Sequence, residues 1–124
     1  METTIYNPEE NEAVTVMEVR GDVDDGEQGA DGVCGLMRSL VSSGALFIVM
    51  DLSQTDFLAS EALGEMLALL ARVRLKGGDL VLVARAGAVL AALNAVRVGD
   101  LTQILESRDE AIALLAAQAG ESRE

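Results

Sequence analysis

The sequence contains no histidine, and Cys34 is its single cysteine. Without histidine, the chain lacks the commonest metal ligand in proteins and the side chain that most often transfers protons near neutral pH. One cysteine excludes a disulfide within the chain and a cysteine-rich zinc site, which is typical of an intracellular protein. These absences argue against most hydrolase mechanisms, so we expect no enzymatic activity, no metal and no cofactor.

Aromatic residues and long apolar stretches are also scarce. Aromatics make up 2% of the chain, which leaves an aliphatic core and no platform for stacking bases or sugars. The longest apolar stretch, residues 45–50, is far shorter than the roughly 20 residues of a membrane-spanning helix. The first residues lack the basic start of a signal peptide. We therefore expect a cytoplasmic protein with no direct membrane insertion.

Basic residues are also few. The 124 residues include 21 acidic and 9 basic side chains, for a net charge of −12, so nucleic acid phosphates would be repelled. Half of the residues are hydrophobic, which is enough for one folded core. We expect residues 1–124 to form a single domain, with a core over about 13–117 and loose ends at 1–10 and 119–124.

Three segments have the composition of main strands. In residues 13–20 apolar and polar side chains partly alternate, and the pattern stops at Gly21-Asp22. This predicts a strand with one face exposed to solvent. Residues 45–52, apolar on both faces until Asp51, and residues 80–84, after the turn at Gly77-Gly78, predict central strands covered on both sides. Short strands are expected near residues 3–6, before an Asn7-Pro8 turn, and at 103–105.

Helical periodicity occurs between these strands. Residues 60–76 carry an apolar stripe at helical spacing, residues 33–41 carry another that closes at Gly44, and residues 88–96 predict a small helix. Ser107 and Glu110 have capping-box spacing at the start of a last helix. Alternating strands and helices predict an α/β fold. The stripe in the longest helix consists of Leu63, Met66, Leu67, Leu70 and Val73.

The first helix has unusual glycine spacing. Glycine recurs at every third position, at Gly26, Gly29, Gly32 and Gly35, and each glycine inside a helix costs about 1 kcal/mol relative to alanine. A helix that begins late, after a long loop, explains this spacing better than a mobile or very closely packed helix. Cys34, between apolar neighbours on this helix, is expected to be a small buried hydrophobe.

Three motifs in order carry a family resemblance. They are Gly21-Asp22-Val23-Asp24 after a strand, the run from Asp51-Leu52-Ser53 to Phe57-Leu58-Ala59-Ser60-Glu61-Ala62-Leu63-Gly64, and Gly77-Gly78-Asp79-Leu80. Together they resemble a STAS domain of the anti-sigma factor antagonist type over about residues 13–117. The resemblance implies a mixed sheet of four or five strands with about four helices, and no intrinsic catalysis.

The resemblance also implies a regulatory serine. In such proteins the turn usually reads Asp-Ser-Ser/Thr-Gly-Leu-Gly, and its first Ser or Thr is phosphorylated by a partner kinase that is also an anti-sigma factor. Ser60 matches that acceptor, Leu63 and Gly64 match the following Leu-Gly, and Asp24 matches an acidic residue of the earlier turn. Three neighbours depart from the pattern, namely Ala59, Glu61 and Ala62 in place of Asp, Ser or Thr, and Gly.

Ser60 has two explanations that are compatible. Its hydroxyl at a helix start would be an N-cap, worth about 1 kcal/mol against alanine. A phosphate there would be tolerated by the free N–H groups of the helix, while a docked partner would meet added negative charge beside Asp56 and Glu61. Glu61 has two interpretations. Its negative charge would interact favourably with the dipole at the start of the helix, or it would place a permanent charge next to Ser60.

The acidic turn around residues 22–27 offers a candidate cation site. Asp22, Asp24, Asp25 and Glu27 supply oxygen ligands, but the spacing lacks the D-x-D-x-D-G pattern of a calcium loop. A solvated turn is therefore the favoured interpretation.

The resemblance favours a regulatory protein-binding module. We expect it to bind an anti-sigma factor and serine kinase, to release it when Ser60 is phosphorylated, and not to bind nucleic acid. The alternative is a STAS scaffold subunit of a larger signalling or membrane-transport complex, so an oligomer is possible. The expected partner-binding residues are Asp22, Asp24, Ala59, Ser60, Glu61 and Leu63, with an apolar contribution from residues 86–93.

Overall fold

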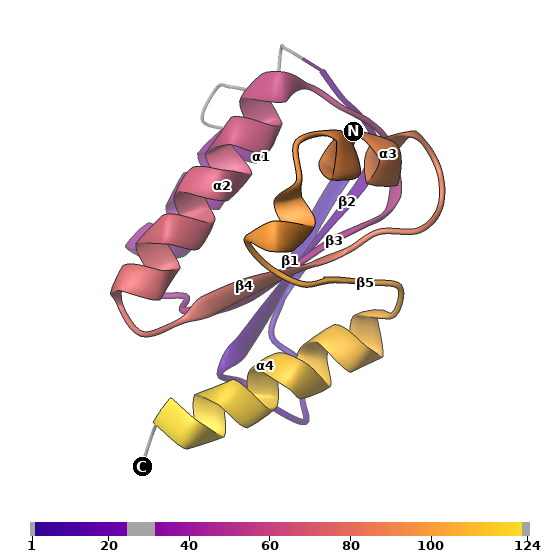
Figure 1. Cartoon of the computed structure of the whole chain (residues 1–124). Helices are drawn as coiled ribbons and strands as arrows, with labels where there is room; N and C mark the ends of the chain where they lie inside the picture. Colours follow the sequence, from indigo (N-terminus) through magenta and orange to yellow (C-terminus); the bar gives the residue numbers. More distant parts are fainter. Residues whose placement is uncertain (1, 25–31, 123–124) are drawn as a thin grey trace.

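The computed structural model describes residues 2–24 and 32–122 (Figure 1). The elements follow one another as strands and helices in alternation after an initial pair of strands. In chain order they are β1 (Glu2–Tyr6), β2 (Val14–Val23), α1 (Val33–Ser42), β3 (Phe47–Leu58), α2 (Ser60–Leu75), β4 (Asp79–Val83), α3 (Ala88–Ala95), the 3₁₀ helix η2 (Val98–Asp100), β5 (Ile104–Leu105) and α4 (Arg108–Ser122).

The five strands form one mixed sheet in the order β1-β2-β3-β4-β5. β1 is antiparallel to β2, and the other three pairs are parallel. The fold is therefore α/β, with a mixed five-stranded sheet and four α-helices, as the sequence predicts.

Helices cover both faces of the sheet. One face packs against α1, α2 and α3, and its core includes Met50 of β3 and Met66 of α2. The other face packs against α4, where Val49 of β3 meets Leu115. Figure 1 shows α4 by itself on this side. Because successive residues of a strand point to opposite faces, β3 is buried on both, which confirms the prediction of a covered central strand.

β2 and β3 are longer than predicted. The strand at 13–20 was expected to stop at Gly21, but β2 continues to Val23, with an irregularity between Gly21 and Asp22 where Gly21 has φ +87°. A bulge of this kind accommodates a glycine without ending the strand. The strand predicted over residues 45–52 continues as β3 to Leu58, and in this second half the Thr55 hydroxyl donates to the Val19 carbonyl at 2.8 Å.

Both expected loose ends are partly ordered. Residues 2–6 form β1, which confirms the short strand expected there and corrects the loose end over 1–10. At the other end α4 runs to Ser122, and Ala119 is buried, so the packed region continues beyond 117.

The helices begin and end close to the predicted positions. The N–H of Glu110 donates to the Ser107 hydroxyl at 3.3 Å, the contact that the capping box predicts. In α2 the buried stripe also includes Leu69, while Leu63 and Leu67 are half-buried. A Cβ on Gly78 would overlap the Leu46 carbonyl, so only glycine fits this turn.

Cys34 and Gly35 are buried in α1, as expected for a small apolar residue beside a late helix start. The glycines at 26 and 29, and the acidic residues at 25 and 27, lie outside the described residues. None of the described helices is long and apolar enough to cross a membrane.

Candidate functional site

Ser60 is the first residue of α2 and is exposed. The N-cap position belongs to Ala59, which has an extended backbone, accepts the first helical hydrogen bond from Leu63 and is only 4% exposed. The predicted capping role of the Ser60 hydroxyl is therefore wrong, because the helix begins one residue earlier than a serine cap requires. No side-chain cap satisfies the first turn of α2.

The end of β2 lies directly beside this helix start. Val23 pairs with Leu58, and the N–H of Ala59 donates to the Val23 carbonyl at 2.7 Å. Asp22 and Asp24 flank Val23, and both are exposed. The structure thus brings Asp22 and Asp24 next to the start of α2, as the sequence predicts for one surface.

Phe57 is an exposed aromatic residue at the same end of the sheet. It pairs with Asp22, one step before the pair of Val23 and Leu58 that points into the α1–α2 core. Because neighbours along a strand alternate, Phe57 and Asp22 point to the α4 face. α4 begins at Arg108, which contacts Asp51, so it leaves the last part of β3 uncovered.

The sequence interpretation missed Phe57, which is 51% exposed. Phe57 lies beyond the end of the strand predicted over residues 45–52, so the alternation of that strand was not used to decide whether its side chain is buried. Its position three residues before the candidate acceptor is the one feature of the sequence that could have drawn attention to it.

Leu63 and the loop before α3 form the border of this end. Leu63, one turn into α2, is half-buried and packs against the core. Of residues 86–93, expected to add an apolar contact, Val89 and Leu93 are buried, while residues 86–88 are exposed. Residues 85–89 line a small pocket of about 180 Å³ together with Ser53, Thr55 and Asp56 of β3.

Negative charge surrounds Ser60 and Phe57. Asp22, Asp24, Asp56 and Glu61 are all exposed at this end of the molecule. Within residues 2–24 and 32–122, no three acidic, histidine or cysteine side chains lie close enough together to hold a metal ion. The acidic end therefore has the charge to select a basic protein surface.

The most tightly connected charges lie elsewhere, between α4 and the sheet. Arg108 contacts Asp51 at 2.7 Å, Glu18 at 2.8 Å and the Tyr6 hydroxyl at 3.0 Å. Burial lowers the pKa of Arg108, but its hydrogen bonds to Tyr6 and Asp51 outweigh this effect and raise the pKa above its ordinary value. Arg20 pairs with the other oxygen of Glu18. Since each carboxylate has a cationic partner, this cluster joins the strands to α4.

Known proteins resemble this chain over nearly its whole length. A family model described as STAS domain matches residues 6–111. An anti-sigma factor antagonist from Mycobacterium paratuberculosis has a similar structure, with a TM-score of 0.81, 21% identity and 92% of each chain covered. A putative anti-sigma factor antagonist from Thermotoga maritima follows, with a TM-score of 0.77, 15% identity, and 91% of this chain and 93% of that chain covered.

The anti-sigma factor antagonist SpoIIAA is a further structural neighbour. The Bacillus cell fate determinant SpoIIAA in its phosphorylated form gives a TM-score of 0.68 at 14% identity, with 90% of this chain and 97% of that chain covered. A search of curated protein sequences found no match.

Proposed function

The chain belongs to the STAS domain family, and we propose that it is an anti-sigma factor antagonist that works by partner switching. In this proposal it binds an anti-sigma factor in the cytoplasm and so releases a sigma factor. The partner is also a serine kinase that phosphorylates Ser60 and thereby ends the interaction. The chain itself performs no catalysis, because the kinase supplies the phosphoryl transfer.

The exposed hydroxyl of Ser60 is the observation that carries this proposal. It stands at the start of α2, and helix capping does not use it. The backbone around it is held by the hydrogen bond from Ala59 to Val23 and by the pairing of Leu58. A kinase can therefore reach the hydroxyl, while the fold beneath it stays in place.

The charge around Ser60 explains how phosphorylation would act. The free N–H groups at the start of α2 accommodate a phosphate, so the folded state tolerates it. A partner surface that covers Ser60 would instead bury roughly −1.5 to −2 further charges beside Asp24 and Glu61. Burying like charges together is unfavourable, so the complex dissociates.

The experiment uses a purified anti-sigma factor kinase from the organism that encodes this chain. Incubation with ATP is expected to add one phosphoryl group to the wild-type chain and none to S60A, as measured by intact mass. By calorimetry S60A binds the kinase like the wild type, and S60D binds at least about tenfold more weakly, or about 1.4 kcal/mol. Q103E, with one added charge on an exposed residue before β5, is the matched control and binds normally.

Two results would contradict the proposal. One is phosphorylation of S60A, which would place the acceptor elsewhere. The other is unchanged binding by S60D within a large, stable assembly in light scattering. That second result would favour the scaffold subunit, for which the permanent charge of Glu61 next to Ser60 is the supporting feature.

A further inference from the structure

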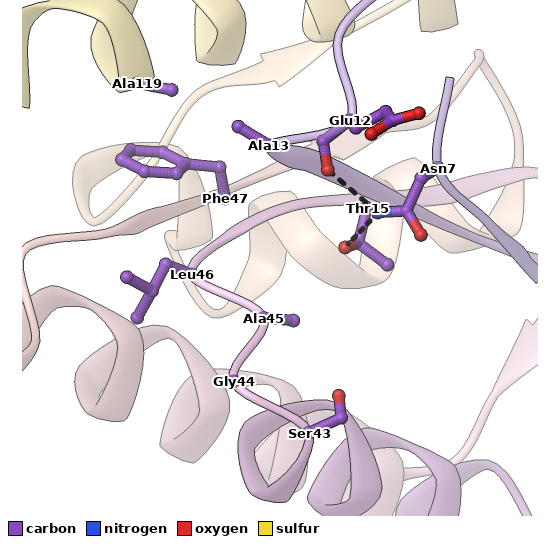
Figure 2. Close-up of a pocket in the computed structure, with 10 residues that line it drawn as sticks. All are labelled: Asn7, Glu12, Ala13, Thr15, Ser43, Gly44, Ala45, Leu46, Phe47 and Ala119. Atoms are coloured by element: carbon purple, nitrogen blue, oxygen red, sulfur yellow. Dashed lines mark hydrogen bonds between the residues drawn. The ribbon is translucent and has the colours of Figure 1, made fainter. Parts of the chain in front are cut away.

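A larger pocket lies at the opposite end of the sheet, where β2 and β3 begin (Figure 2). Its volume is about 630 Å³, within the range of small-molecule sites. Ala119, near the end of α4, closes one side. The lining comes from the β1–β2 turn, the α1–β3 connection, the first residues of β2 and β3, and α4. It consists of Asn7, Glu12, Ala13, Thr15, Ser43, Gly44, Ala45, Leu46, Phe47 and Ala119.

Most hydrogen-bond donors of this lining are already used. The side-chain NH₂ of Asn7 donates to two backbone carbonyls and to the Thr15 hydroxyl, at 3.0 to 3.2 Å. The backbone N–H groups of Ala13, Gly44 and Ala45 donate within their own turns. A ligand in this pocket therefore meets few free donors.

The acceptors, in contrast, remain available. Asn7 keeps its side-chain oxygen, which Figure 2 shows pointing away from Glu12. The hydroxyl of Ser43 donates to the Leu40 carbonyl at 2.9 Å, and its lone pairs stay open. Glu12 is exposed and carries the one formal charge among the ten lining residues. The polar part of the pocket thus suits a ligand rich in donors and positively charged.

The remaining wall is apolar. Phe47 and Ala119 belong to the core between the sheet and α4, and Leu46 packs against that core. Ala13 and Ala45 add small side chains, which leave the space open. Such a wall suits a hydrocarbon body held next to the polar rim.

We propose that this pocket binds a small organic cation, in which an ammonium or amidinium group is carried on an apolar body. The Glu12 carboxylate is the charge partner of the cationic group, and the body packs against Phe47 and Leu46. This site lies at the opposite end of the sheet from Ser60, so the proposal does not depend on phosphorylation of Ser60.

A titration of the full ¹⁵N-labelled chain with 2-phenylethylammonium tests this proposal by NMR. Saturable amide shifts are expected over residues 12–15 and 43–47, and the anion phenylacetate is expected to give none there. E12Q, at an exposed position, weakens binding about two- to fivefold because it removes one exposed charge interaction. E9Q, a matched change in the same connection that does not line the pocket, binds like the wild type.

The proposal is overturned by three outcomes. The first is the absence of saturable shifts when 2-phenylethylammonium is added to roughly 10 mM, because a dissociation constant above that concentration would mean no specific binding. The second is equal binding of phenylacetate. The third is a set of shifts that maps away from residues 12–15 and 43–47, or that E12Q and E9Q change equally.

Discussion

Ala59 leaves the start of α2 without a side-chain cap. Its backbone has the extended conformation of an N-cap, with φ −67° and ψ 153°, but a methyl group accepts no hydrogen bond. A hydroxyl at position 59 should therefore stabilise the first turn of α2 relative to a methyl group of the same shape. The expected gain is about 1 kcal/mol, since a threonine oxygen can accept an N–H of the first turn.

The isosteric pair A59T and A59V isolates the hydroxyl at this buried position. Both variants add similar volume, so crowding affects them equally, and the free energy of unfolding in urea should be about 1 kcal/mol higher for A59T. Equal stability of the two variants would show that the first turn of α2 has no free N–H group to cap.

The individual residues of the site were only partly predictable. Asp24, Ser60 and Leu63 could be located by the order of the motifs, and the structure brings Asp24 and Ser60 to one end of the sheet. Phe57 could not be identified, because its exposure depends on where α4 begins. The capping role of Ser60 failed because a one-residue shift of a helix start changes which side chain is the cap.

At the scale of elements, α4 is joined to the sheet by the cluster around Arg108. Its guanidinium contacts Asp51, which is 1% exposed, and Glu18, whose side chain is 6% exposed. Removing one partner of a buried ion pair leaves an uncompensated charge, which costs about 3 to 5 kcal/mol. Because the Arg108 side chain is itself 36% exposed and Arg20 still pairs with Glu18, solvent reduces this cost, and R108M should lower the free energy of unfolding by about 2 kcal/mol in urea denaturation.

R97M provides the matched control for this prediction. Arg97 pairs with Asp100 on the surface, where the two side chains are 81% and 62% exposed, so its loss should cost less than about 1 kcal/mol. Equal stability of R108M and R97M would contradict the role of the Arg108 cluster in holding α4.

The order of the elements was predictable from alternation and periodicity, whereas the lengths of β2 and β3 were not. Gly21 and the polar residues 53–56 resemble the ends of strands in sequence. The bulge at Gly21 and the hydrogen bond of the Thr55 hydroxyl nevertheless allow β2 and β3 to stay paired beyond these positions. Such continuation depends on contacts between segments more than 30 residues apart. The ion cluster escaped prediction for the same reason, since Arg108 is 57 residues from Asp51.

At the scale of the whole molecule, the two ends of the sheet differ in chemistry. The end with Ser60 exposes Phe57 and four acidic side chains, while the other end has the larger pocket between β2, β3 and α4. The net charge of −12 favours the approach of basic partners to either end. An anchor such as Phe57 is needed to make one end specific for a protein surface.

The most direct measurement of the central claim is an NMR footprint of the anti-sigma factor kinase on the full ¹⁵N-labelled chain. The account predicts that the amides over residues 22–24 and 56–63 lose intensity or shift most, while residues 43–47 at the opposite end stay unchanged. A footprint centred on α4 or on residues 43–47, with no change around Ser60, would contradict it.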